Sequence, residues 1–187
     1  MTPQQFITLL QQYAPEITQA VNRKLPVKIG AIGKKFFRDN FRKGGFQDYG
    51  LHPWQRTHRQ RYAKGAVAQY KPLMSGRQNL YGSIAYTPAT ARVSIGTDVP
   101  YADIHNEGAD IVITRRMHRF FWAKYREANG GTWKRKTPEA DFWKALALKP
   151  VGSTLHIPQR QFIGESRELN NKIQQTIEDT INKIIKQ

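Results

Sequence analysis

The C-terminal part of the sequence carries the clearest folding signal of the chain, a single apolar stripe at helical spacing. The stripe is formed by Leu169, Ile173, Ile177, Ile181 and Ile184. Acidic residues stand at the start of this segment and lysines at its end, an order that suits the dipole of a helix. The pattern therefore predicts a long amphipathic helix that must bury one face against the rest of the protein.

The first part of the chain predicts further amphipathic helices. Thr2 and Pro3 are typical of a helix start, and apolar residues follow at helical spacing until Pro15, where we expect an interruption. In residues 26–44 an apolar stripe rich in phenylalanine stands opposite lysines and arginines, which predicts a helix with a cationic outer face. Residues 1–43 are therefore expected to form N-terminal helices.

The middle of the chain predicts a loop followed by a hairpin. Residues 44–76 are rich in glycine, glutamine and basic residues without a clean period, so we expect a long basic loop that becomes ordered on assembly. The runs LYGSIAY (80–86) and ARVSIGT (91–97) then predict two strands of a β-hairpin, joined across residues 87–89.

The next segments predict a short helix, two strands and an insertion. YADIHNE (101–107) is expected to be a short helix that Gly108 ends. DIVIT (110–114) and STLHI (153–157) predict strands, and two runs with helical spacing lie between them. Residues 115–150 are therefore expected to be a helical insertion between strands.

Together these elements predict one α+β domain over residues 1–187. We expect a small antiparallel sheet flanked by the N-terminal helices and the long C-terminal helix. No run of apolar residues approaches the length of a membrane span, and the first residues lack the pattern of a signal peptide. We therefore expect a soluble protein with no membrane partner.

The charge balance points to polyanions or an acidic partner. Thirty lysines and arginines against fourteen acidic residues give a formal net charge of +16. Residues 49–97 contain no acidic residue at all. Their candidate contacts to DNA or to a partner are Arg56, Arg59, Arg61, Lys64 and Lys71. This segment suits a phosphate backbone, although a solvated basic loop would have the same composition.

The histidine in YADIHNEG stands among carboxylates and raises the question of an active site. Asp103 and Glu107 share a helix face, but two carboxylates are few for a hard cation. The chain has no cysteine, which excludes disulfides, thiolate nucleophiles and sulfur-ligated zinc. We therefore predict no catalytic, metal or cofactor site. We expect His105 to bond a neighbouring backbone carbonyl or the turn around Arg160, although a nuclease or another hydrolase remains an alternative.

Three motifs in order resemble one known family. GRQNLYGSI, VSIGTDVPYADIHNEG and IPQRQFIG, followed by an amphipathic helix, are similar to the signatures of phage virion morphogenesis, or tail completion, proteins, above all those of Mu-like phages. The resemblance covers residues 73–187, and Gln161 stands where the family commonly has proline. The matching positions are Gly76, Arg77, Gly96, Thr97, Tyr101, Ala102, His105, Gly108, Pro158, Arg160, Phe162 and Gly164.

The resemblance implies a non-enzymatic structural protein of the phage particle. Related neck proteins of tailed phages join head to tail, so it implies a subunit of a ring, a hexamer, at the neck or tail terminus. Its expected partners are copies of itself, the portal or neck and tail proteins, and packaged DNA in the channel. Its expected place of synthesis is the cytoplasm of the bacterial host. A free nucleic-acid-binding protein that uses residues 49–97 is the alternative.

Overall fold

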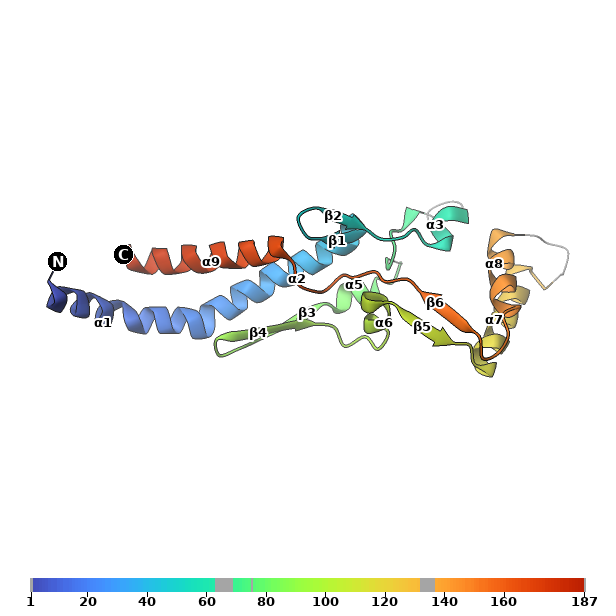
Figure 1. Cartoon of the computed structure of the whole chain (residues 1–187), viewed down its shortest axis with the longest axis horizontal. Helices are drawn as coiled ribbons and strands as arrows, with labels where there is room; N and C mark the ends of the chain where they lie inside the picture. The colour runs from blue at the N-terminus through green and yellow to red at the C-terminus, as the bar shows by residue number, and fades with distance from the viewer. Residues whose placement is uncertain (1, 63–68, 75, 132–136, 187) are drawn as a thin grey trace.

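The protein is elongated, with both chain ends at one end of the molecule (Figure 1). The computed structural model describes residues 2–62, 69–74, 76–131 and 137–186. Helices run lengthwise through the half that holds the termini, and a pair of helices, α7 and α8, lies across the opposite end. Within the described residues, no helix combines the length and the apolar character needed to cross a membrane.

The N-terminal helices form one continuous rod. Helix α1 spans Pro3–Gln19 and begins with a capping box in which Thr2 and Gln5 bond each other's backbone. A π-helical turn, η1 (Ala20–Lys24), joins it directly to α2 (Leu25–Lys43). The predicted interruption at Pro15 is wrong, because this exposed proline lies inside α1, where water can satisfy the backbone carbonyl that its missing N–H leaves free.

Helix α2 is the packing centre of the larger half. Its apolar face buries phenylalanines, as the spacing predicted, and contacts β3, β4 and α9. Gly30 and Gly33 lie so close to Tyr86 and Ile95 that a methyl group at either glycine would overlap those side chains. The helix ends at Gly44, which adopts a left-handed conformation with φ of 74°.

The segment predicted as a basic loop begins instead with regular structure. Strands β1 (Gly45–Gln47) and β2 (Leu51–Pro53) pair antiparallel, and α3 (His58–Tyr62) follows. The loop prediction is wrong for these residues, because Phe46 and Trp54 are buried and fasten a polar stretch to the core. Residues 63–68 and 75 of the predicted loop lie outside the described residues.

The predicted hairpin is present with different bounds. Its strands are β3 (Ala85–Ala89) and β4 (Arg92–Gly96), and they turn at residues 90–91 instead of 87–89. The first half of the predicted strand is a helix, α5 (Asn79–Ser83). Leu80 and Ile84 explain the difference, because their spacing of four residues places both in the core, where Leu80 is 4% and Ile84 0% exposed.

The elements after the hairpin follow the predicted order. Helix α6 (Ala102–Glu107) leads into β5 (Ala109–Val112), which pairs antiparallel with β6 (Thr154–Ile157). Between these strands lie α7 (Arg115–Ala128) and α8 (Pro138–Ala147), and Thr114 and Thr137 cap their N-termini. The closing helix is α9 (Arg167–Ile185).

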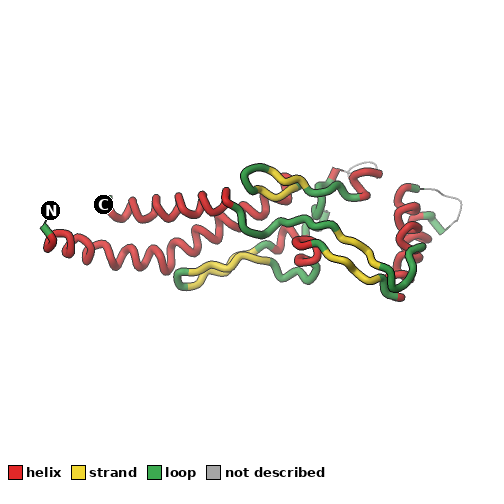
Figure 2. Tube along the Cα trace, in the orientation of Figure 1, coloured by secondary structure: helices red, strands yellow, loops and turns green. Residues whose placement is uncertain are grey.

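The predicted α+β class is confirmed, but the strands do not form one sheet. In the described residues they form three separate two-stranded ribbons, drawn in yellow in Figure 2. Two hydrophobic cores accompany them: a larger one centred on α2, with Phe41 and Ile84, and a small one between α7 and α8, with Ile113, Phe121 and Ala147. The β5–β6 ribbon leads from the first core to the second (Figure 1).

Candidate functional site

Residues 158–164 form a turn between β6 and α9 that meets segments from three other parts of the chain. This region, called the junction below, brings α2, the residues directly after β2, α6 and the turn together. Among the positions that carried the family resemblance, those in α6 and in the turn meet here. The junction is therefore the candidate functional site.

Phe162 is the apolar anchor of the junction. Its side chain is 1% exposed, and its ring lies 5.0 Å from that of Phe41 in α2. The Nδ2 of Asn40 donates to the Phe162 carbonyl oxygen at 3.0 Å. The Oδ1 of Asn106 accepts from the backbone N–H groups of Phe162 and Ile163, at 2.9 and 3.0 Å. The polar backbone around the buried ring is thus satisfied by two asparagines.

Those two asparagines were not identified from the sequence. Asn40 is fully buried, and its Oδ1 also accepts from the backbone N–H of Gln47 at 3.2 Å, so it joins α2 to β1 and to the turn. Its position could have been suspected, since it is a polar residue three and four places after Phe37 and Phe36 on the apolar face of α2. Asn106 carries no comparable signal.

Arg160 is buried against backbone. Its N–H donates to the His105 carbonyl oxygen at 2.7 Å, which links the turn to α6. Its guanidinium Nε and Nη2 each lie 3.4 Å from the Gln55 carbonyl oxygen. Burial lowers the pKa of this guanidinium, yet arginine stays charged in proteins. The side chain therefore places a fixed positive charge inside the junction.

His105 makes its link through its backbone and not through its ring. The Nδ1 atom is buried and has no hydrogen-bond partner, so the expected side-chain bond is absent from the described structure. Tyr101 contacts the ring edge-on, with ring centroids 5.9 Å apart. Burial, and secondly the charge of Arg160, lower the pKa of His105. The ring therefore stays neutral further into the acid range than a free histidine.

The unfolding free energy of the protein is expected to fall as the pH drops below about 6.5, the pKa of an unfolded histidine. In the unfolded chain His105 takes up a proton there, whereas in the folded chain its lowered pKa resists protonation, so acid favours unfolding. Substituting His105→Gln should flatten the dependence of stability on pH below about 6.5.

Urea unfolding of parent and variant at several pH values measures this slope. His58, whose pKa is also lowered by burial and by Arg61, should keep part of it, and the double variant with His58→Gln should be flatter still. A His105→Gln protein with the parent's slope would contradict the assignment.

The two glycines of the junction differ in the space that a larger side chain would find there. Gly108 ends α6 with φ of 76°, and a Cβ there would lie 2.9 Å from the backbone nitrogen of Gln159. This close approach lets β5 and the turn run side by side, so Gly108 has a backbone role. A Cβ on Gly164 would meet only the flexible side chain of Gln161.

The other positions of the resemblance lie at the rim of the junction or away from it. Thr97 follows β4, and its Oγ1 lies 2.6 Å from the Ser83 Oγ of α5. Ala102 is buried, and Tyr101 is 42% exposed. Gly76 and Arg77 are exposed before α5. The two remaining positions are the half-buried Pro158, which opens the turn, and the half-buried Gly96, which ends β4.

The described cationic candidates of the middle segment differ in their surroundings. Arg56 and Arg61 are exposed near α3, and Lys71 instead donates to the Lys43 carbonyl oxygen at the end of α2, at 3.2 Å. The side chain of Arg59 and the whole of Lys64 lie outside the described structure. Lys71 therefore has a structural contact that the sequence did not reveal.

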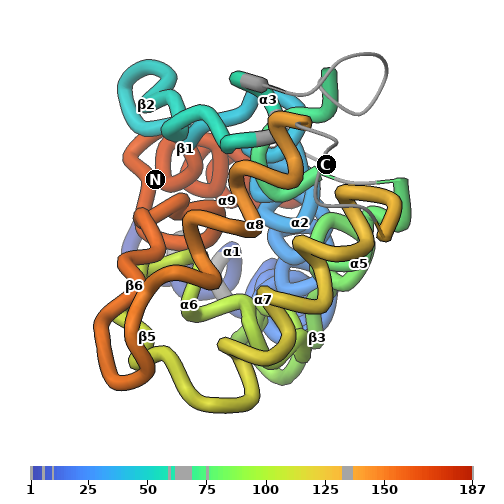
Figure 3. Tube along the Cα trace, turned by 90° about the vertical axis from the view of Figure 1, so that its right-hand side faces the viewer, coloured from blue at the N-terminus to red at the C-terminus, as the bar shows by residue number. Residues whose placement is uncertain are grey.

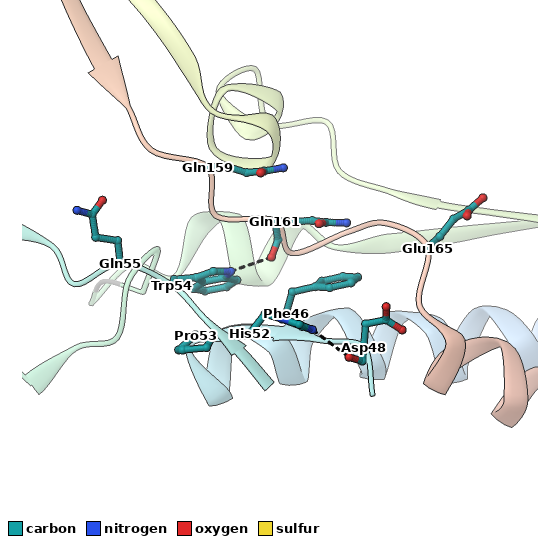
Figure 4. A pocket seen from close by; sticks show the side chains of 9 residues that line it. All are labelled: Phe46, Asp48, His52, Pro53, Trp54, Gln55, Gln159, Gln161 and Glu165. Atoms are coloured by element: carbon teal, nitrogen blue, oxygen red, sulfur yellow. Dashed lines mark hydrogen bonds between the residues drawn. The ribbon is translucent and has the colours of Figure 1, made fainter. Parts of the chain in front are cut away.

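An open groove of about 390 Å³ lies beside the junction (Figure 4). The Nε1 of Trp54 donates to the Gln161 carbonyl oxygen at 2.8 Å, so two residues that line the groove are bonded to each other. The groove is lined by Phe46, Asp48, His52, Pro53, Trp54, Gln55, Gln159, Gln161 and Glu165. The His52 Nε2 lies 3.0 Å from the Asp48 backbone oxygen, so a backbone carbonyl, and not a carboxylate of the groove, orients the imidazole. This lining suits contacts to polar backbone better than acid–base chemistry.

The carboxylates near His105 do not assemble a metal site. Asp103 and Glu107 are exposed on α6, and Asp110 pairs instead with His156 across the β5–β6 ribbon, at 2.8 Å. Within the described residues, no group of three histidine or acidic residues could hold a metal ion. The junction is thus built from buried backbone contacts, an apolar anchor and one enclosed cation.

Comparison with known proteins agrees with the motifs. A model of the phage virion morphogenesis family matches residues 47–182, which confirms the resemblance drawn from the sequence. No curated protein and no protein of solved structure matches the chain.

Proposed function

We propose, on the premise that this chain belongs to the phage virion morphogenesis family, that it is a ring-forming subunit that completes the tail or joins it to the head at the neck of the particle. In this role it is a structural component without catalytic activity. Its partners are neighbouring copies of itself and the portal, neck or tail proteins above and below the ring. A hexamer is the copy number that the sequence resemblance implied.

One structural observation carries this proposal: the chain has two separate cores joined by a two-stranded ribbon. Among the described residues, the buried cluster of the small core between α7 and α8 consists of Ile113, Phe121 and Ala147. A two-stranded ribbon is marginally stable in water on its own, because each strand has an unpaired edge. Such an arm is well suited to rest on a neighbouring subunit.

Exposed apolar side chains at the far end of the ribbon support the same conclusion. Val112, the last residue of β5, is 58% exposed. Leu148 and Val151, in the connection from α8 to β6, are 63% and 47% exposed. Large apolar groups grouped on a thin element are typical of a surface that another chain covers.

The end that holds the termini offers a second apolar surface. Ile7 and Leu9 of α1 are 54% and 39% exposed, and Ile177 and Ile185 of α9 are 37% and 47% exposed. Helices α1 and α9 contact each other, so these residues belong to one end of the molecule. Two different surfaces on one subunit are what a head-to-tail ring requires.

The proposal is tested by the mass of the assembly and by particle formation. The parent protein is expected to assemble as its concentration rises, measured by light scattering after gel filtration. The double variant Val112→Glu with Leu148→Glu should stay monomeric and folded, because buried carboxylates would oppose the contact. As a control, Leu51→Glu alters an exposed residue of β2 away from the ribbon and should assemble like the parent.

Complementation of a phage that lacks the gene separates the outcomes further. The parent and the Leu51→Glu control should restore infectious particles, and the ribbon variant should yield heads and tails that remain apart. A monomeric parent together with full complementation by the ribbon variant would overturn the proposal.

A further inference from the structure

Helix α7 carries a group of cations that the proposed function does not use. The helix contains five lysines and arginines and a single acidic residue, Glu127. Lys124 pairs with that acid at 2.7 Å. The remaining four cations, called the arginine face below, are exposed and have no hydrogen bond or ion pair within the described residues: Arg115, Arg116, Arg119 and Arg126.

These arginines lie together on the helix and away from its core. At about 100° per residue, Arg115, Arg119 and Arg126 fall within roughly 40° of one another around the helix axis. The buried Phe121 and Tyr125 fall roughly 100° to 140° around the axis from the centre of this group, toward the side where α8 packs. The three aligned arginines thus form a stripe about 16 Å long at 1.5 Å rise per residue.

The composition of this face fits a phosphate backbone better than a protein surface. Protein interfaces depend on a central apolar or aromatic anchor. Here Ala123 is exposed among the arginines and provides no anchor, and the neighbouring Trp122 is half-buried against the small core. The exposed aromatic of the helix, Phe120, packs edge-on against Trp143 of α8. Exposed guanidinium groups without acceptors nearby are suited to bind phosphates, and contacts to phosphates carry no information on base sequence.

The location of α7 favours contact with a long polyanion. Helices α7 and α8 face the viewer in Figure 3, at the end of the molecule remote from both termini. Helix α3 adds positive charge nearby, since its His58 ring lies 4.3 Å from that of Phe142 in α8. Arg56 and Arg61 flank that histidine and are exposed.

We infer that the arginine face of α7 is a contact surface for the phosphate backbone of duplex DNA, independent of base sequence. This inference goes beyond the proposed function, which assigns no contact to DNA. It places that contact on α7, whereas composition favoured residues 49–97. It also does not require ring formation, since a single subunit presents the whole face.

The test measures binding of the full-length protein to a fluorescent duplex of mixed sequence by anisotropy across a range of salt. The variant called the stripe variant below changes the three arginines of the stripe and also Arg116, and thus the whole arginine face, to glutamine. A matched control removes the same charge in the half of the molecule that holds the termini, where Arg23 and Lys24 of η1 and Lys183 and Lys186 near the end of α9 are exposed. A second comparison, Arg56→Gln with Arg61→Gln, tests the segment that composition favoured.

The parent should bind duplexes of different sequence alike, with affinity that falls steeply as salt rises. The stripe variant should lose up to about 3.6 units of the slope of log affinity against log salt, which is 0.9 for each of four contacts. The charge-matched control should keep the parent's slope, and thermal melts should show all variants folded. Arg56→Gln with Arg61→Gln should lose less of the slope than the stripe variant.

Three results would overturn the inference. The first is a parent that does not bind duplex DNA at low salt, and the second is a stripe variant with the parent's slope. The third is binding to a polyglutamate competitor that matches or exceeds binding to DNA and is lost in the stripe variant, which would assign the face to an acidic protein partner.

Discussion

Replacing Phe162 with alanine is expected to lower the free energy of unfolding by about 3 to 5 kcal/mol, the usual cost of truncating a buried aromatic side chain. The ring is 1% exposed and packs on Phe41, with Tyr81 and Trp54 contacting the other sides of that phenylalanine. The cavity would open where the turn, α2 and β2 meet. For a chain of this size the Tm should fall by roughly 6 to 20 °C.

Urea denaturation and thermal melts of the purified protein measure this effect. Phe162→Leu retains most of the apolar volume and should lose clearly less stability than the alanine variant. Tyr49→Ala is the surface control, because this ring is 72% exposed and stacks with the Arg167 guanidinium, so its loss should cost at most about 1 kcal/mol. A Phe162→Ala protein as stable as the parent would remove the apolar anchor from the junction.

Replacing Asn40 with leucine should cost about 2 to 6 kcal/mol, because one buried and one half-buried backbone group each lose their partner at about 1 to 3 kcal/mol. These groups are the Phe162 carbonyl oxygen and the Gln47 N–H. Leucine has a similar size, so the loss would come from hydrogen bonding and not from a cavity. Asn171→Leu, at an exposed position of α9, should change stability by no more than about 0.5 kcal/mol.

The variant Asn40→Asp distinguishes hydrogen bonding from packing by its pH dependence. Its carboxylate keeps the acceptor for Gln47 but turns a second oxygen toward the Phe162 carbonyl. Burial raises the pKa of such a carboxyl, so the folded variant binds a proton that the unfolded chain releases above about pH 4. The stability deficit relative to the parent should therefore grow from pH 4 to pH 7. An equal deficit at both pH values would exclude the hydrogen bond to Phe162 as its cause.

Several elements were predictable because their signals are local. The stripe of α9 and the phenylalanine-rich face of α2 have the period of a helix and predict which side is buried. The threonines before α7 and α8 satisfy N–H groups of the first turn, and Gly108 accepts a positive φ at the end of α6. Each of these features depends on residues within a few positions of one another. The order of motifs likewise predicted the family.

The wrong strand prediction and the wrong loop prediction have the opposite property, since both depend on contacts between distant residues. Residues 80–83 have the composition of a strand but lie in helix α5, because Leu80 and Ile84 are both buried in the α2 core. Strands β1 and β2 are ordered in a polar stretch, because Phe46 and Trp54 bury themselves against distant segments. In these places the free energy of burial outweighs local preference, which spans only about 1 kcal/mol per residue.

Residue patterns along the chain were enough to predict the class of the protein, its major helices, the surplus of positive charge and the family to which it belongs. The construction of the junction became visible in the folded chain alone, since Asn40 bonds a residue 122 positions away and Asn106 one 56 positions away. Tertiary contacts also place the unpaired arginines together on α7, because Lys124 neutralises Glu127 and the packing of Phe121 turns the arginine face outward. The physical reason is that periodicity and capping act along the chain, whereas burial and hydrogen-bond satisfaction depend on which distant segments meet.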